Sequence, residues 1–406
     1  MCSLICTFAT VIERILLILL TFCSCFSTAT AQQYTYNLDF ELSAKDFCDT
    51  IPITYERGQV YIMVEAEGLQ LRFKLDTGSS TGVVYTDTPL HGLKTLGTIM
   101  SHDANGRSSR VNVVQLPPLK LSPHLTLSRY AATVHSRRSG RSDHDGIIGF
   151  SLFSKGVAAK INTREGYMVL TDRRKQLRRE PGFGVRYKLM RHVPRIEVSP
   201  FQKTTVSATF DTGSPRLLAL NAADYAGCLK RQPDIDKQEE GRCRGQMAIG
   251  NYGVEPEAEV VFLGLERLMW GEYRFCDVHC ITTQGDSHIG AALLQWGTLT
   301  ILPRDRRLVF SPYDEESRET MVSNRQLDVA FVPRNDKPAV GLVLPNGEAW
   351  QQGFRPGDVI EEIDHQPVTN FVEFVRRGFL NGKYYTFTLR DRDGQVRYIN
   401  AIMPTR

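Results

Sequence analysis

The string Asp-Thr-Gly-Ser occurs twice in this 406-residue chain, at residues 76–79 and 211–214. Each copy follows a strand-like run, residues 71–75 and 205–210, so that the aspartate ends the strand. The glycine permits a tight turn that aims the carboxylate outward, and the neighbouring hydroxyls can hydrogen-bond around it. A single copy is equally well explained as an Asx-type turn between two strands. Two copies, each at the end of a hydrophobic strand, are much harder to attribute to turns alone.

These repeated motifs resemble those of the pepsin-like aspartic proteases, in which one chain supplies two such motifs from two lobes. In that family, a later hydrophobic-hydrophobic-glycine element in each lobe passes beside the catalytic loop and completes a psi-shaped crossing. The matching elements lie at residues 145–149 and 288–290, and the residues expected in the crossings are Ile147, Ile148, Gly149, Ile289 and Gly290. Each element is followed by two more strand-like runs, so the similarity covers about two thirds of the chain.

The resemblance implies that Asp76 and Asp211 form a catalytic pair, in which one carboxyl takes a proton from water while the other protonates the peptide. Two like charges about 3 Å apart repel by roughly 5 kcal/mol at an effective dielectric of ~20. The pair therefore holds one proton and titrates as a unit, and neither a metal nor a cofactor is needed. The supporting residues implied by the resemblance are Thr77, Gly78, Ser79, Thr212, Gly213 and Ser214.

Each kind of supporting residue has a role in the family pattern. The two threonines would carry crossed hydrogen bonds that lock the loops together, and the two glycines would donate backbone N–H groups to the aspartates. Ser79 and Ser214 would hydrogen-bond the outer carboxylate oxygens. Because hydrogen bonds to an ionised carboxylate favour that form, serine at both positions predicts a pH optimum on the acid side of neutral.

A hairpin is expected between the strand-like runs at residues 98–100 and 111–114, because Asn105 and Gly106 form an Asn-Gly turn. By position, this hairpin matches the flap that closes over bound peptide in the pepsin-like family. The pepsin pattern has a tyrosine near the flap tip, and this sequence has none there. The role of that tyrosine is therefore not carried over.

Few segments of either repeat show sustained helical periodicity, which predicts a mainly β fold with short helices near residues 222–225 and 291–294. The expected architecture is a bilobal pepsin-like β-barrel fold followed by an α+β PDZ domain. The expected segments are a signal peptide over 1–31, a first lobe over 32–175, a linker over 176–184, a second lobe over 185–316 and a PDZ domain over 322–406.

The last part of the chain resembles a PDZ domain. Its most recognisable run is Gly-Phe-Arg-Pro-Gly-Asp-Val-Ile at residues 353–360, followed by an expected helix over 370–378 and a hairpin turning at 391–394. PDZ domains add an extended peptide to a sheet edge and often capture its terminal carboxylate, so a peptide or protein partner is expected here. The stretch that would hold the carboxylate, residues 323–327, contains no glycine. The sequence therefore supports the fold more than carboxylate capture.

The N-terminus has the features of a secretory signal. Arg14 precedes an apolar run over residues 15–22, and residues 29–31 form a small-x-small cleavage site. The apolar run is too short to span a bilayer. The protein is therefore expected to be exported to a periplasmic or extracellular space, and a lipid anchor on Cys23 or Cys25 is the alternative that would attach it to a membrane.

Export affects how the cysteines are interpreted. The mature chain would keep Cys48 in the first repeat and Cys228, Cys243, Cys276 and Cys280 in the second. One or two disulfides are expected in the second repeat, because the compartment is oxidising. The last two cysteines are not expected to pair with each other, since residues four apart on a strand are separated by roughly 13 Å. A zinc or haem site in the same short run lacks a second ligand pair and the required residue order.

The charge balance does not favour a nucleic-acid partner. The formal net charge is only +4, from 49 basic and 45 acidic residues. Basic clusters at residues 136–141 and 172–179 contain no interleaved aromatic residues, so they are expected to be solvated loops. The oligomeric state stays open.

Two alternative functions also stay open. Residues 78–82 match Gly-x-Ser-x-Gly, the nucleophile elbow of α/β-hydrolases, although that motif requires a following helix and residues 83–86 are strand-like. The other alternative is a catalytically inactive peptide-binding or scaffold protein with protease-like lobes, which fold resemblance alone does not exclude. Both aspartates and both Thr-Gly-Ser contexts are intact, which favours an exported aspartic endopeptidase.

Overall fold

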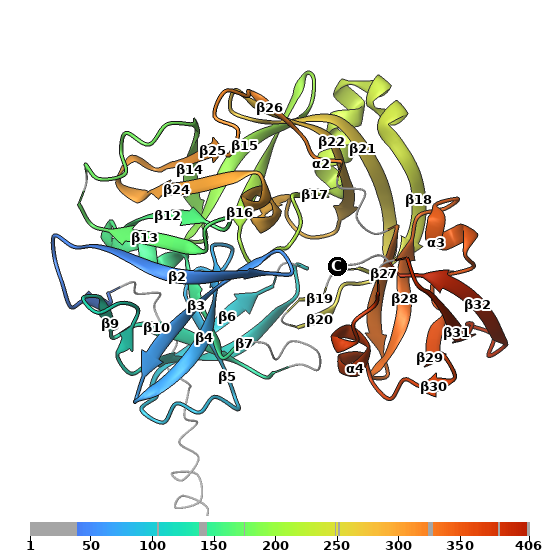
Figure 1. Cartoon of the computed structure of the whole chain (residues 1–406), viewed down its shortest axis with the longest axis horizontal. Helices are drawn as coiled ribbons and strands as arrows, with labels where there is room; N and C mark the ends of the chain where they lie inside the picture. The colour runs from blue at the N-terminus through green and yellow to red at the C-terminus, as the bar shows by residue number, and fades with distance from the viewer. Residues whose placement is uncertain are drawn as a thin grey trace, which may run out of the picture.

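The computed structural model describes residues 39–103, 105–137, 144–173, 175–247, 249–250, 252–323, 328–380 and 382–403. Strands make up most of the regular structure, and the helices are short (Figure 1). The prediction of a mainly β fold is therefore confirmed, together with the short helices near residues 222–225 and 291–294. The predicted signal peptide and residues 324–327 of the predicted carboxylate loop lie outside the described residues.

The first half of the chain is built almost entirely from strands. In order, its elements are β1 (Glu41–Leu42), β2 (Cys48–Glu56), β3 (Gln59–Ala66), β4 (Leu69–Asp76), β5 (Gly82–Tyr85), β6 (Lys94–His102), β7 (Ser108–Gln115), β8 (Leu119–Lys120), β9 (Thr126–Ser128), β10 (Ala131–His135), β11 (Gly146–Gly149), η1 (Phe150–Lys155), β12 (Ala158–Asn162) and β13 (Tyr167–Thr171). The period of two explains these strands. In β2, Ile51 and Ile53 are buried while Pro52 and Thr54 are exposed.

The second half repeats this pattern and adds one longer helix. Its elements are β14 (Phe183–Met190), β15 (Val193–Phe201), β16 (Thr204–Asp211), β17 (Leu218–Asn221), α2 (Ala222–Arg231), η2 (Pro233–Gln238), β18 (Glu239–Gly245), β19 (Ile249–Gly250), β20 (Gly253–Val254), β21 (Ala258–Trp270), β22 (Tyr273–Thr283), β23 (His288–Gly290), η3 (Ala291–Gln295), β24 (Gly297–Leu302), η4 (Pro303–Asp305), β25 (Arg307–Pro312) and β26 (Glu319–Met321). The last strand lies between the predicted second lobe and the predicted PDZ domain, and it pairs in parallel with β22.

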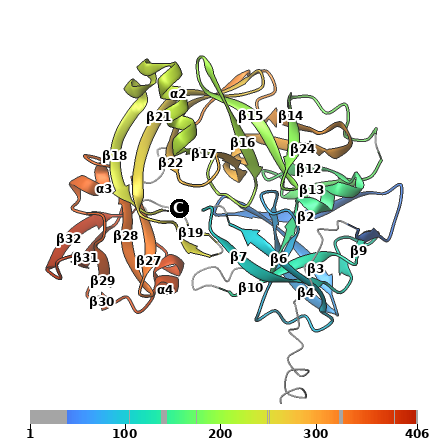
Figure 2. The ribbon, with the colours of Figure 1, turned by 180° about the vertical axis from the view of Figure 1, so that it is seen from behind.

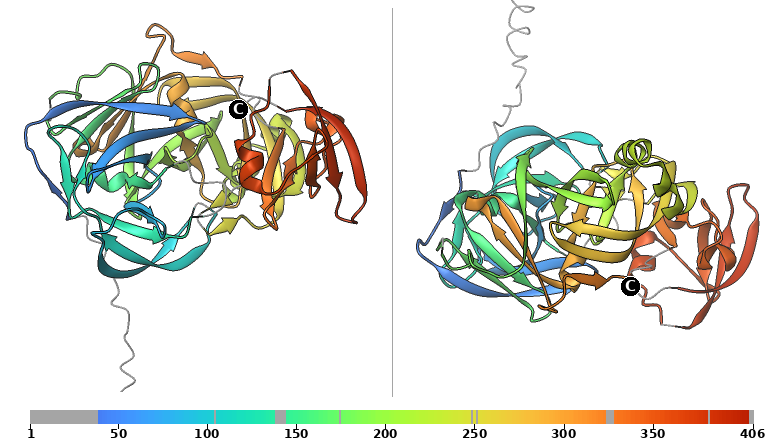
Figure 3. Two further views of the ribbon diagram at one scale, coloured as in Figure 1. Left: turned by 60° about the horizontal axis from the view of Figure 1, so that its bottom comes forward. Right: turned by 90° about the horizontal axis from the view of Figure 1, so that it is seen from above.

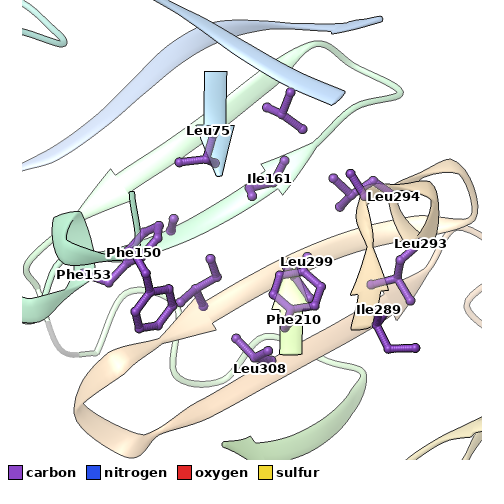
Figure 4. Close-up of a cluster of buried hydrophobic side chains, with 14 of the residues drawn as sticks. Leu75, Phe150, Phe153, Ile161, Phe210, Ile289, Leu293, Leu294, Leu299 and Leu308 are labelled. Carbon is purple, nitrogen blue, oxygen red and sulfur yellow. The ribbon is translucent and has the colours of Figure 1, made fainter. Parts of the chain in front are cut away.

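An antiparallel sheet joins the two halves of the chain. Its strand order is β2-β13-β12-β24-β25-β14, with three strands from each half, and the junction is the pairing of β12 with β24. Figure 4 shows Leu75 from the first half and Phe210 from the second beside this sheet, with Ile161 and Leu299 from its two central strands. All four side chains are buried in one hydrophobic core that spans both halves. The sheet therefore anchors the two strands that precede the aspartates.

The C-terminal unit has its own sheet and its own core. Its elements are β27 (Val329–Arg334), β28 (Lys337–Val343), α3 (Glu348–Gln351), β29 (Val359–Ile363), β30 (Gln366–Pro367), α4 (Phe371–Arg376), β31 (Tyr384–Arg390) and β32 (Val396–Ile402). The core contains aromatic rings that pack mostly edge-to-face, including Phe331 against Phe374 with a centroid separation of 4.9 Å. Gly357, in the run at residues 353–360, has a φ of 96°, a backbone conformation that favours glycine.

The C-terminal unit packs against the second half of the chain. The Gln246 N–H donates to the Gly341 carbonyl over 2.8 Å, and Leu342 lies in a hydrophobic cluster with Cys243 and Phe262. Figure 2 shows this contact from behind, and the two views of Figure 3 show the C-terminal unit and the first half at opposite ends of the molecule. The second half therefore connects the other two parts.

Truncation of Phe210 tests the shared core. Because the ring is fully buried and packs edge-on against Trp270, Phe210→Ala should lower the free energy of unfolding by about 3–5 kcal/mol. Urea unfolding followed by tryptophan fluorescence measures this loss. As a control, Leu189→Ala at an exposed site should change stability by less than about 0.5 kcal/mol. A similarly small loss for the Phe210 variant would contradict the prediction.

Candidate active site

Each aspartate ends a strand that runs parallel to, and very close to, another strand of the same half. Asp76 at the end of β4 is in register with Gly149 of the parallel strand β11, and Asp211 at the end of β16 is in register with Gly290 of β23. A Cβ added to either glycine would collide with backbone carbonyl groups of the adjoining loop. Only glycine allows so close an approach. The packing at this site therefore requires the glycine at the end of each hydrophobic-hydrophobic-glycine element.

Thr77 and Thr212 connect the two loops that carry the aspartates. The Thr77 hydroxyl donates to the Phe210 carbonyl (2.7 Å) and accepts from the Thr212 N–H (3.0 Å). In the same way, the Thr212 hydroxyl donates to the Leu75 carbonyl (2.8 Å) and accepts from the Thr77 N–H (3.0 Å). Both threonine side chains are completely buried, so these bonds satisfy groups that water cannot reach. Four crossed hydrogen bonds therefore hold one loop against the other.

The side chains of Asp76 and Asp211 meet at this seam, within hydrogen-bonding reach of each other. A Cβ added to Gly78 would collide with the Asp211 carboxyl, and one added to Gly213 would collide with the Asp76 carboxyl. Each loop therefore needs a glycine so that the carboxyl of the opposite loop can lie against its backbone.

Backbone N–H groups bind the carboxylates. The Ser79 N–H donates to Asp76 Oδ1 (3.0 Å) and the Gly213 N–H donates to Asp211 Oδ1 (2.8 Å). The serine hydroxyls have other partners: that of Ser79 donates to the carbonyl of residue 81 (2.8 Å), and that of Ser214 accepts from the N–H of residue 216 (3.5 Å). The two serine hydroxyls therefore do not make the expected hydrogen bonds to the carboxylates. The predicted pH optimum on the acid side of neutral rested on those bonds and no longer has that support.

Burial raises the pKa of Asp211 to about 7, and the negative charge of Asp76 contributes to the rise. The Lys74 ammonium acts in the opposite direction, since it favours the ionised form. A hydrogen bond to Asp76 raises this pKa again, and the Gly213 N–H lowers it. Below about pH 7, Asp211 therefore keeps most of its proton and can supply the acid that a combined acid and base requires.

Three residues that the sequence analysis did not single out contact the pair or the loop around it. The Lys74 ammonium lies 3.4 Å from Asp76 Oδ2. The Gln59 amide donates to the Gly213 carbonyl (2.6 Å) and accepts from the Tyr61 hydroxyl (2.9 Å). The strand period could have identified Lys74, because residues two apart on a strand share a face. Gln59 and Tyr61 gave no such signal, since their role depends on how β3 packs against the second loop.

The predicted flap is the hairpin of β6 and β7, and its tip contacts the second half of the chain. Asn105 donates from its side-chain amide to the Gly253 carbonyl (3.2 Å). The Tyr252 N–H donates to Asp103 Oδ2 (3.0 Å). Gly106 has a φ of 75°, as the tight turn requires. The tip is therefore attached to the small hairpin of β19 and β20.

Several expectations and alternatives raised by the sequence can be compared with the structure. Residues 78–82 lead directly into strand β5, whereas a nucleophile elbow requires a helix there. Within the described residues, no cluster of His, Cys, Asp or Glu is arranged to hold a metal ion. The expected disulfides are also missing from that part of the chain, where the free thiols are Cys48, Cys228, Cys243, Cys276 and Cys280. None of the helices described there is long and apolar enough to cross a membrane.

Comparisons with known proteins gave similarity of structure alone. No protein-family model matches the chain, and no match was found among the curated proteins. The aspartic proteinase from Irpex lacteus is similar at 13% identity and a TM-score of 0.43, over 68% of this chain and 100% of that one. Basic 7S globulin from soybean is similar at 10% identity and a TM-score of 0.41, over 69% and 99% of the two chains. Conglutin gamma, a basic 7S globulin from lupine seeds, is similar at 12% identity and a TM-score of 0.40, over 66% and 95%.

Replacement of Asp211 by asparagine tests its raised pKa. A carboxyl with a pKa of about 7 in the folded protein and an ordinary value of 3.8 when unfolded binds more protons in the folded state between those values. It therefore makes the folded protein less stable as the pH rises through that window. The melting temperature of Asp211→Asn, relative to the wild type, should rise from about pH 4 to about pH 7 and then stay constant. Scanning calorimetry across the pH range measures this difference.

A control separates this effect from a simple loss of charge. Asp314→Asn removes a carboxylate from an exposed site in the second half, so its melting temperature relative to the wild type should show no comparable trend. A relative melting temperature of Asp211→Asn that is flat, or that falls, between about pH 4 and 7 would contradict the raised pKa.

Removal of the Asp103 carboxylate tests the attachment of the flap. Asp103→Ala removes the acceptor for the Tyr252 N–H and for two N–H groups of the turn itself. Amide hydrogen exchange should become several-fold faster both at the flap tip and in residues 249–254. Asp391→Ala is a matched control, because Asp391 accepts from two N–H groups of its own turn in another hairpin, and its effect should stay near that turn. Faster exchange at the flap tip alone would show that the two hairpins are not coupled.

Proposed function

We propose that this protein is an exported aspartic endopeptidase that hydrolyses peptide bonds with Asp76 and Asp211. The observation that carries the proposal is the meeting of two carboxyls, one from each half of the chain, on loops that are held together by crossed hydrogen bonds. Such a pair, with one proton between its members, can act as a base and as an acid in the same step. The proposed location is the periplasm or the extracellular space, as the N-terminal signal features indicate.

In the proposed reaction, the ionised carboxyl takes a proton from water as the water oxygen bonds to the peptide carbon. The protonated carboxyl gives its proton to the carbonyl oxygen, which produces a neutral tetrahedral intermediate. The first carboxyl then protonates the amide nitrogen while the carbon–nitrogen bond breaks. The second carboxyl recovers a proton from a hydroxyl of the intermediate, so the pair returns to its starting state. The products are a new carboxylic acid and a new amine.

The C-terminal unit is proposed to be a PDZ-like module that binds an extended peptide, from a substrate or from a protein partner. Among the described residues, β27 is paired on one side only, with β28, and so offers a free sheet edge. The helix α4 lies beside that strand, with Phe374 against Phe331 (Figure 1). A strand edge beside a helix is the arrangement to which PDZ domains add a peptide. The boundaries of the two lobes and of this module are part of the same proposal.

A second function is favoured by one observation. The tip of the flap is hydrogen-bonded to the opposite half of the chain through Asn105 and Asp103, and these contacts would have to open for a long peptide to pass beneath the tip. A protein that keeps this arrangement closed would be a peptide-binding scaffold with protease-like lobes rather than an enzyme.

Substitution of one aspartate distinguishes the two functions. The mature protein is incubated with a diverse peptide pool at several pH values, and new termini are identified by mass spectrometry. The wild type should cleave peptides, and Asp76→Asn should lower kcat/KM by about 10³-fold or more because the pair can no longer exchange a proton with water. Unchanged circular dichroism of the variant shows that it is folded. Absence of cleavage by the wild type at every pH supports the scaffold instead.

A serine variant provides the matched control. In the Gly-x-Ser-x-Gly reading of residues 78–82, the nucleophile would be Ser80. Ser80→Ala should therefore leave most of the activity if the aspartates act on water, and should abolish it if the serine attacks. A pepstatin-like transition-state mimic should inhibit the wild type, whereas a serine-directed phosphonate should not.

A further inference from the structure

Lys74 gives one member of the carboxyl pair a partner of opposite charge. It lies on β4 two residues before Asp76, so the two side chains share a face of the strand. The ammonium nitrogen is 3.4 Å from Asp76 Oδ2, and the two side chains are only 10% and 14% exposed. Mobile ions screen such a buried pair much less than a pair on the surface. Salt therefore weakens the action of this positive charge on the carboxyls only a little.

The two halves of the site differ at this position. In the first half, Lys74 is in register with Ile147, two residues before the pairing of Asp76 with Gly149. In the second half, the equivalent pairing is that of Thr209 with His288. A buried threonine therefore stands where the first half has a cation, and burial lowers the pKa of the adjacent His288, which favours its neutral form. Among the described residues, it is thus the first half that places a charged ammonium beside its aspartate.

The neighbours of Lys74 on β3 and β4 have charge partners of their own. Tyr61 is opposite Lys74 on β3. The guanidinium of Arg72 lies over the Tyr61 ring at 3.9 Å and pairs with Glu56 at 2.7 Å. The ion pair of Lys74 is with Asp76. Of the two basic residues on this face of β4, it is therefore Lys74 that acts on the pair.

The groups near β11 are also engaged elsewhere. The Asp145 carboxylate accepts from the Arg72 N–H (2.8 Å). The His144 ring is hydrogen-bonded to the Tyr85 hydroxyl (2.8 Å) and lies 6.0 Å from the Tyr61 ring. These contacts direct both titratable groups toward partners other than the aspartates.

We propose that Lys74 is a positioning residue that assigns the single proton of the pair: it keeps Asp76 ionised, as the base toward water, and leaves the proton on Asp211, as the acid toward the peptide. The terms base and acid rest on the proposed function. Which of the two carboxyls holds the proton can be measured even in a protein without activity. Burial is the largest cause of the raised pKa of Asp211, and the Lys74 charge lowers that pKa, so the direct support for the assignment is the contact of Lys74 with Asp76. The ammonium contacts Asp76 at 3.4 Å and so adds a charge difference between the two carboxyls to the burial and the backbone contact that already act on Asp211.

The consequence for pH dependence follows from the sign of the charge. A cation near the pair favours each loss of a proton, so it lowers both apparent pKa values that bound the singly protonated state. Without it, both limits should move to higher pH by about 1 to 3 pH units, as expected for an opposite charge at this range. The singly protonated state would then also be shared more evenly between the two carboxyls.

Three variants of Lys74 test the proposal. Lys74→Met removes the charge and keeps most of the volume, Lys74→Thr makes the two halves alike, and Lys74→Arg keeps the charge. The pH profile of kcat/KM for Lys74→Met and Lys74→Thr should move upward at both limits, whereas that of Lys74→Arg should stay within about 0.5 pH units of the wild type. Unchanged profiles for both neutral variants would overturn the proposal.

A measurement that needs no catalysis keeps this inference separate from the proposed function. Carboxyl carbon-13 resonances are recorded across pH in full-length mature protein labelled at aspartate, and Asp76→Asn and Asp211→Asn identify the two signals. In the wild type, the Asp211 signal should be that of the protonated form, and the Asp76 signal that of the ionised form, between the two apparent pKa values. Equal protonation of the two carboxyls overturns the proposal, even if no neutral variant folds. If the wild type cleaves no peptide but shows this assignment, and Lys74→Met makes the protonation of the two carboxyls more equal, the proposed function fails and the role of Lys74 stands. An unchanged assignment in Lys74→Met overturns that role.

Discussion

Two buried threonine hydroxyls hold together the two loops on which the rest of the site depends. Thr77 and Thr212 each donate to a carbonyl of the opposite half and accept from the other's N–H. Two carboxyls placed within hydrogen-bonding reach repel each other when both are ionised. The loops that carry them must therefore be fixed by interactions that repulsion cannot displace, and hydrogen bonds between buried groups have that property because breaking them leaves unsatisfied polar atoms.

Those loops are in turn anchored by the hydrophobic core. Leu75 and Phe210 immediately precede the two aspartates, and both are buried beside the sheet that contains strands from each half (Figure 4). A strand whose last hydrophobic residue is fixed in the core can hold a charged residue at the next position with little freedom of movement. The raised pKa of Asp211 shows the energetic consequence, since a buried carboxyl destabilises the folded state once it is ionised. Functional geometry and stability therefore oppose each other at this residue.

Contacts outside the pair make the site asymmetric. The first half supplies Lys74 and the flap, while the second half supplies the hairpin of β19 and β20 that contacts the flap tip. Ile249 of that same hairpin packs against the core of the C-terminal unit. One short hairpin thus contacts both the flap and the C-terminal unit, so two parts of the molecule that are far apart in sequence share a common neighbour.

The sequence by itself determined the mainly β class, the two strand-ending aspartates and the Asn-Gly turn at residues 105 and 106. Each of these depends on local chemistry, either strand periodicity or a turn preference. The glycines of both crossings were expected from the family resemblance of the motifs rather than from local chemistry. Only the tertiary structure decided the pairing of β12 with β24, the direction of the Ser79 hydroxyl and the approach of Lys74 to Asp76. It also decided that the cysteines described are free thiols. The strand pairing and the free thiols depend on distances between distant segments and on burial, which the spacing of residues along the chain does not encode. The contacts of Ser79 and Lys74 join residues two apart, and they depend on side-chain conformations that the surrounding fold selects.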